Sequence, residues 1–61
     1  MPIVQIDMLP RTVEQKRVIV EKVTQAFVEA ANVPPENITI IIRDMQPENY
    51  GKAGKLHCDK K

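Results

Sequence analysis

The sequence predicts an α/β fold, of the α+β kind, with a single βαβ unit that makes up one domain over residues 1–61. Three segments predict it. An alternating apolar run opens the chain, an amphipathic helical pattern of about five turns follows, and an isoleucine-rich run comes next. Two strands joined by a helix run parallel through a right-handed crossover.

The first strand is expected over residues 3–9, "IVQIDML". Val4, Ile6 and Met8 fall on one face of this run, because side chains alternate along a strand. Pro10 ends the strand, since proline has a fixed φ and no N–H to donate to a neighbouring strand.

The helix is expected over residues 13–31. Thr12 precedes Gln15 by three positions, the spacing of a capping box, which places the helix start at Thr12. Apolar residues recur on one side and most charged residues fall on the other, as in an amphipathic helix. The apolar positions are Ile19 or Val20, Val23, Phe27, and Ala30 or Ala31. Asn32 and the proline pair soon after it end the helix.

The second strand is expected over residues 38–45, "ITIIIRDM", the segment richest in β-branched residues. Both of its faces are partly apolar. One face carries Ile38, Ile40 and Ile42, and the other carries Thr39, Ile41, Arg43 and Met45. A single helix covers one face of a two-stranded sheet, whereas parallel sheets are normally covered on both. We therefore expect a second chain to bury the other face.

The size of the chain also favours an oligomer. With 43% hydrophobic and 28% charged residues, the composition is globular. Burial of apolar surface contributes about 85 kcal/mol by surface scaling, whereas ordering the chain costs about 90 kcal/mol. The single cysteine closes no disulfide within the chain, and no Cys and His residues have the spacing of metal ligands. Oligomerisation is the remaining source of stability.

The charge balance argues against nucleic acid and anionic membrane surfaces as partners. The net charge is +1, so no general electrostatic field attracts either of them. The apolar runs are too short to span a bilayer. The amino terminus has no basic region followed by an apolar core, so we expect a cytoplasmic protein.

The start "MP" is the first candidate for chemistry. If Met1 is removed, as a small second residue generally permits, the Pro2 nitrogen becomes a secondary amine, and a free amino terminus has a pKa of about 8 in model compounds. Burial in an apolar site lowers such a pKa and favours a neutral base at physiological pH. With Met1 retained, the nitrogen is an amide without basicity. The alternative is that the Met-Pro start is an accident of translation.

Arg11, Arg43 and Tyr50 are candidate substrate-binding residues. Arg11 lies between the first strand and the helix, where a guanidinium group and a helix start both favour a carboxylate; the alternative is a solvated loop arginine. Arg43 is either an edge or interface charge or a ligand contact. Tyr50 begins the turn "YGKAG" and is either a packed surface residue or an apolar wall that keeps water from the amine.

The last segment, "QPENYGKAGKLHCDKK", is expected to carry turns up to Gly54 and then a polar tail. His57 and Cys58 are adjacent, so their side chains point to opposite sides of an extended segment. Both are interpreted as tail residues.

An ordered set of residues runs through the chain. It comprises Met1-Pro2, Leu9, Arg11 with Glu14-Gln15-Lys16, the isoleucine-rich strand ending in Met45, and the turn with Tyr50-Gly51 and Ala53-Gly54. By this set and by its length, the whole chain resembles the 4-oxalocrotonate tautomerase family of the tautomerase superfamily.

The resemblance implies a βαβ subunit with a carboxyl-terminal hairpin, assembled as a homohexamer, a trimer of dimers, with active sites shared between subunits. It implies an enol-keto tautomerase, an isomerase of small unsaturated 2-hydroxy acids. In that mechanism Pro2 is the base and then the acid, Arg11 binds a substrate carboxylate, and Tyr50 takes the place of an aromatic wall. No cofactor or metal is needed.

Two departures from the family pattern bear on the substrate. Members active on dicarboxylates carry an arginine at the position of Thr39, and the loop before Arg11 is one residue shorter than usual. Arg43 lies four residues beyond Thr39, about 13 Å along a strand. A monoacid enol, such as an aryl or alkyl enolpyruvate, fits the missing charge better. Two alternatives stay open: Pro2-dependent hydratase, dehalogenase or imine chemistry, and a non-catalytic structural oligomer.

Overall fold

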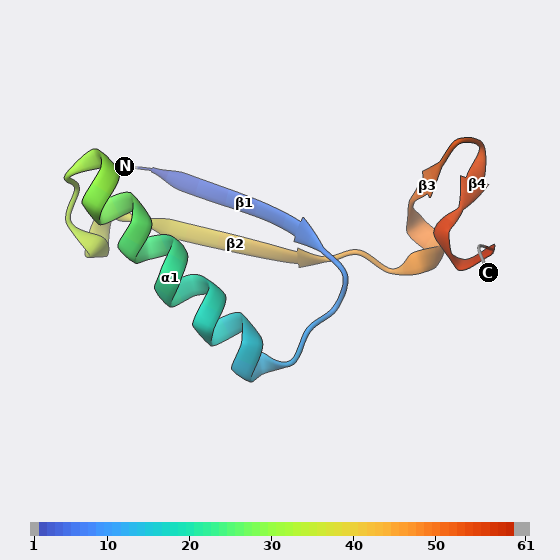
Figure 1. Cartoon of the computed structure of the whole chain (residues 1–61), viewed down its shortest axis with the longest axis horizontal. Helices are drawn as coiled ribbons and strands as arrows, with labels where there is room; N and C mark the ends of the chain where they lie inside the picture. The colour runs from blue at the N-terminus through green and yellow to red at the C-terminus, as the bar shows by residue number, and fades with distance from the viewer. Residues whose placement is uncertain (1, 60–61) are drawn as a thin grey trace.

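The chain forms a βαβ unit followed by a small β-hairpin in a computed structural model that describes residues 2–59 (Figure 1). The unit consists of β1 (Ile3–Met8), α1 (Val13–Ala31) and β2 (Thr39–Asp44), and the hairpin consists of β3 (Gly51–Lys52) and β4 (Lys55–Leu56). Three short 3-10 helices span Pro35–Asn37, Pro47–Asn49 and His57–Asp59. The predicted α+β fold, with parallel strands and a carboxyl-terminal hairpin, is confirmed.

β1 and β2 pair in parallel, in the register that sets Met8 opposite Asp44. A backbone hydrogen bond extends the pairing at each end. The Thr39 N–H donates to the Pro2 carbonyl at 3.1 Å, and the Met45 N–H donates to the Met8 carbonyl at 2.7 Å. At each end of the sheet, the two strands therefore stay hydrogen-bonded to each other one residue beyond the regular pairing.

The strands are slightly shorter than the sequence predicts. β1 stops before Leu9, which leads into the proline of the following loop, and β2 stops before Met45. β2 starts after Ile38, because the Ile38 N–H donates to the Pro35 carbonyl at 3.1 Å as part of a 3-10 turn. Turn hydrogen bonds outside the sheet thus set one of the boundaries that side-chain alternation leaves open.

α1 has the predicted bounds and the predicted capping box. The Thr12 hydroxyl oxygen accepts the Gln15 N–H at 3.1 Å, and the Gln15 side-chain oxygen accepts the Thr12 N–H at 3.2 Å. Asn32 adopts the left-handed conformation (φ 55°), and its N–H donates to the Val28 carbonyl at 3.0 Å. No helix in the described part of the chain is both long and apolar enough to cross a membrane.

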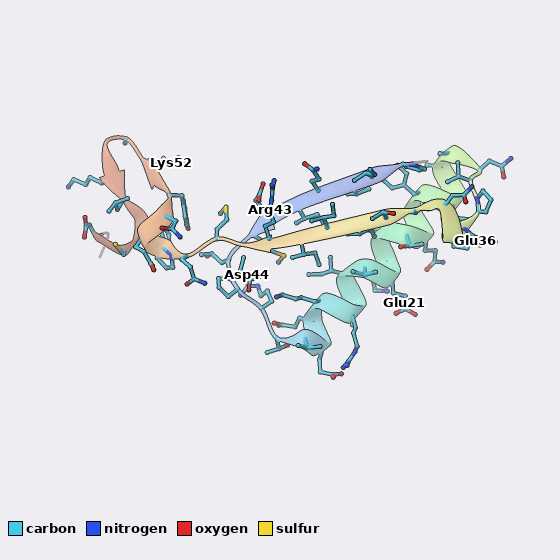
Figure 2. All side chains as sticks on the ribbon, turned by 180° about the vertical axis from the view of Figure 1, so that it is seen from behind. Glu21, Glu36, Arg43, Asp44 and Lys52 are labelled. Atoms are coloured by element: carbon cyan, nitrogen blue, oxygen red, sulfur yellow. The ribbon has the colours of Figure 1, made fainter. Side chains whose placement is uncertain are left out.

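One face of the sheet packs on α1 and the other is open. The half-buried apolar side chains of the covered side come from both strands and from the helix: Val4, Ile6, Met8, Ile40, Ile42, Ile19, Val23 and Phe27. On the opposite face Ile3 is 57% exposed and Ile41 is 40% exposed. Figure 2 shows Arg43 on this open face and Asp44 on the side toward α1. There the Lys16 Nζ lies 3.0 Å from an Asp44 carboxylate oxygen, which ties α1 to the end of β2.

The protomer is extended rather than compact. Its radius of gyration is 14.8 Å and its extents are 43 × 23 × 14 Å, whereas a compact chain of this length has a radius of gyration of about 10.5 Å. Figure 1 shows that the hairpin stands away from the βαβ unit, at the end opposite to the amino terminus. Among residues 2–59 no side chain is fully buried.

The carboxyl-terminal segment differs from the tail that its residues predict. Residues 55–59 form β4 and a 3-10 helix. Ala53 (φ 56°) and Gly54 (φ 81°) both adopt left-handed conformations, which suit a two-residue hairpin turn between twisted strands. The backbone of Gly51 passes so close to Lys55 that a Cβ on Gly51 would lie 2.8 Å from the Lys55 carbonyl oxygen. Glycine is therefore required at the base of the hairpin.

Candidate functional site

Pro2 lies immediately before β1. The start of β1 is at the end of the sheet far from the hairpin (Figure 1). Pro2 is half-buried, and its carbonyl accepts the Thr39 N–H at 3.1 Å, which holds its backbone beside β2. Met1, whose removal would free the Pro2 nitrogen, lies outside the described residues. The fold thus fixes the position of the proline, while processing of the chain decides the chemistry of its nitrogen.

Arg11 follows the opposite end of β1, in the loop that leads to the helix cap at Thr12. It is exposed and borders an open groove of about 440 Å³. The other residues lining this groove are Glu14, Gln15, Val18 and Ile19. Within residues 2–59 the Arg11 guanidinium makes no ion pair, and Glu14, the acid nearest in sequence, pairs with Arg17. Arg11 can therefore offer its charge to a carboxylate beside an apolar surface.

Tyr50 stacks on His57, a contact that sequence reasoning misses. The ring centroids are 4.9 Å apart, the ring planes meet at 19°, and the His57 N–H donates to the Tyr50 carbonyl at 3.0 Å. The prediction that His57 is a tail residue is wrong, because the tight turn at Ala53 and Gly54 reverses the chain and sets His57 opposite Tyr50. Pairing residues outward from that turn is the sequence signal that locates the contact.

Arg43 forms a two-pronged ion pair with Asp7 on the open face of the sheet. The Arg43 Nε donates to one Asp7 carboxylate oxygen at 2.8 Å, and the Arg43 Nη2 donates to the other at 3.1 Å. The parallel register sets the two residues directly opposite each other. Within the protomer the guanidinium fork is occupied, and the role of Arg43 as a ligand contact stays a prediction.

The four candidate residues do not meet in one protomer. Pro2 precedes β1, whereas Arg11, Arg43 and Tyr50 lie at or beyond the far ends of β1 and β2. From Pro2 to Met8 the strand covers about 20 Å. A site that combines the Pro2 amine with the Arg11 charge or the Tyr50 ring therefore takes these groups from different chains.

The residue types that bind metal ions are dispersed. In the part of the chain that the structure describes, no group of three or more His, Cys, Asp and Glu side chains lies close enough together to hold a metal ion. The thiol of Cys58 is exposed and contacts the Asp59 carboxylate at 3.8 Å.

Comparison with known proteins gives consistent matches over nearly the whole chain. A family model described as tautomerase enzyme matches residues 2–60. The chain is 49% identical over 55 residues to the 2-hydroxymuconate tautomerase of Comamonas testosteroni, a match that covers 88% of this chain and 87% of that protein. It is 46% identical over 60 residues to the 2-hydroxymuconate tautomerase of Bacillus subtilis strain 168, covering 97% of each.

A solved structure agrees closely with the fold. The crystal structure of YwhB, a homologue of 4-oxalocrotonate tautomerase, matches with a TM-score of 0.93 at 43% sequence identity. The superposition covers 98% of this chain and 100% of the other, so it includes both the βαβ unit and the carboxyl-terminal hairpin.

Proposed function

Because the chain belongs to the 4-oxalocrotonate tautomerase family of isomerases, we propose that it interconverts the enol and keto forms of a small unsaturated 2-hydroxy acid, with the Pro2 amine carrying the proton. The observation that carries this proposal is the proline at position 2, the residue at which the family match begins. With Met1 removed, this proline supplies a secondary amine at the start of β1.

The proposed reaction is a proton transfer from oxygen to carbon. The neutral Pro2 nitrogen takes the proton of the enol hydroxyl group, and the oxygen electron pair forms the ketone C=O bond. The carbon–carbon π electrons then take the proton back from the prolinium nitrogen at the far carbon of the double bond. Every atom of the enol is present in the keto product, so the step balances without a co-reactant. Arg11 binds the substrate carboxylate, and Tyr50 forms a wall that excludes water.

The proposed site lies between chains. Pro2 precedes β1 and Arg11 follows it, so one chain supplies the amine and a neighbour supplies the guanidinium group. The open sheet face, with Ile3 and Ile41 exposed, is a surface that such an assembly would bury. We propose a homohexamer built as a trimer of dimers from a single domain over residues 1–61.

The proposed substrate carries one carboxylate. Thr39, whose N–H binds the Pro2 carbonyl, places no charge beside the proline. Arg43 is the weaker candidate for a second carboxylate contact, since it would have to release Asp7 first. An aryl or alkyl enolpyruvate therefore suits the site better than a dicarboxylate such as 2-hydroxymuconate, the compound after which two relatives are named.

The first prediction concerns the proline nitrogen. Protein whose intact mass shows that Met1 is absent should ketonise phenylenolpyruvate, followed by ultraviolet absorbance, faster than 2-hydroxymuconate. Protein with one additional residue ahead of Pro2 has an amide at that nitrogen and should lose at least about 100-fold in rate, the contribution of a positioned acid–base group. Circular dichroism, and the number of chains per particle in native mass spectrometry, should be the same for the two preparations.

Three outcomes would count against the proposal. Equal rates from the two preparations would remove the amine from the mechanism. A processed protein with no rate above buffer on either compound would remove the tautomerase proposal for these acids. A mass gain at Pro2 after borohydride treatment with a carbonyl compound, in protein without ketonisation activity, would favour imine chemistry.

A further inference from the structure

His57 has no role in the proposed mechanism, yet the hairpin holds its ring against Tyr50. The centroid distance of 4.9 Å and the interplanar angle of 19° describe a stacked pair. Both residues are half-buried, whereas residues 51–56 between them are all exposed. The stack is thus a packed contact in an otherwise solvent-covered hairpin.

The backbone of the hairpin sets this contact. Residues 51–52 pair with residues 55–56 in the antiparallel register, and the bond from the His57 N–H to the Tyr50 carbonyl continues the pairing by one step. Side chains directly opposite each other in an antiparallel pair lie on the same face, with Cβ atoms about 5 Å apart. His57 therefore meets Tyr50 because of strand register.

We infer that His57 is a positioning residue that fixes the plane of the Tyr50 ring and thereby gives the site a preference for flat, conjugated substrates. The inference rests on the proposed function, in which Tyr50 lines the site. A free tyrosine side chain rotates about two bonds, and a ring that is already fixed loses none of this freedom when substrate binds. A fixed flat wall stacks on the planar ring of an aryl enolpyruvate but gains less from an alkyl chain.

The coupling of one aromatic pair corresponds to about a 2- to 10-fold effect on binding. His57→Ala should therefore raise KM for phenylenolpyruvate by about 2- to 10-fold while kcat stays within about twofold. KM for an alkyl enolpyruvate should change less, so that the aryl preference falls. His57→Phe should keep the parental KM because it restores a planar ring, whereas His57→Leu should not, because leucine supplies bulk without a flat face. Cys58→Ser, at the next residue, is the matched control and should behave as the parent.

The stack itself has a direct spectroscopic reporter. The chain contains one tyrosine and one histidine, so proton cross-relaxation between the two rings is unambiguous in the NMR spectrum. The parent and the Cys58→Ser variant should show it. In the His57→Ala variant the Tyr50 ring protons should shift toward their values in an unstructured peptide, while circular dichroism shows that the βαβ unit is intact.

The outcomes separate this inference from the proposed function. A parent that ketonises neither acid overturns both. An active parent with the ring contact, whose KM and aryl preference do not change in His57→Ala, overturns the inference alone. Equal rescue by His57→Phe and His57→Leu also overturns it, because bulk rather than a stacked plane would then be sufficient.

Discussion

The three arginines of the chain differ in what their guanidinium groups contact. Arg17 pairs with Glu14 on the helix surface, and Arg43 pairs with Asp7 across the two strands. Arg11 makes no ion pair within residues 2–59 and borders a partly apolar groove. Exposed ion pairs add only about 0–1 kcal/mol to stability, yet they occupy the donors that a ligand would need. All three residues are arginines, so it is the guanidinium group, unpaired in the described part of the chain, and the neighbouring groove that single out Arg11 as the candidate for binding a carboxylate.

Replacement of Arg11 tests its assignment. Arg11→Gln should raise KM for phenylenolpyruvate about tenfold or more, with a smaller change in kcat, because hydrogen bonds to a charged group contribute about 1.5–3 kcal/mol. Steady-state ultraviolet kinetics measure both constants. Arg17→Gln removes the same charge on the adjoining helix surface and should leave KM at the parental value. If the two variants behave alike, net charge rather than a contact with Arg11 governs binding.

Among the elements, α1 has bounds that follow from the sequence. The strands of the hairpin, in contrast, have no recognisable sequence pattern. Thr12, Gln15 and Asn32 act within four residues of themselves, so their effect on the helix ends is visible in the sequence. β3 and β4 have two residues each, too few for side-chain alternation to show. Only the family resemblance predicts the hairpin.

The hairpin depends on close backbone approach at one position. Gly51→Ala should open it, because the added Cβ would lie 2.8 Å from the Lys55 carbonyl oxygen and the backbone would have to move. The ring cross-relaxation between Tyr50 and His57 should then be lost. Ala53→Gly is the matched control: it adds no atoms at a residue with φ 56°, where glycine is favourable, and should keep the contact. A stack that survives in Gly51→Ala would contradict this account.

At the scale of the whole molecule, one protomer leaves too much surface uncovered. Its accessible surface is 4923 Å², against about 4,000 Å² for a compact chain of this mass. The open sheet face contributes Ile3 and Ile41, and the outer side of α1 contributes Val13 and Val18. Assembly would bury these apolar side chains and, under the proposed function, would also complete the site.

The sequence predicts that one face of the sheet lacks a covering layer, but it does not predict the ion pair and the ring contact that the structure shows. A second strand with isoleucines on both faces and one helix to cover them predicts a missing layer. The pairing of Asp7 with Arg43 depends on the register of two strands that are far apart in the sequence, and no local pattern encodes that register. The contact of Tyr50 with His57 depends in the same way on the turn between them.

Mixed assemblies test whether the site is shared. Pro2→Ala and Arg11→Gln chains should each be weakly active alone. After they are unfolded, mixed in equal amounts and refolded, random assortment should give about one quarter of the sites an intact proline and an intact arginine from different chains. Activity should rise accordingly, as measured by ketonisation of phenylenolpyruvate. Mixing Pro2→Ala with the double variant is the control without recovery. Hybrid particles seen by native mass, without recovered activity, would contradict a shared site.

The separation of Pro2 and Arg11 along β1 also has an evolutionary consequence under the proposed arrangement. After a gene duplication, one copy needs to retain only the proline and the other only the arginine for a mixed particle to turn over substrate. Drift alone would then make two paralogues depend on each other, and neither gene would show the complete set of residues.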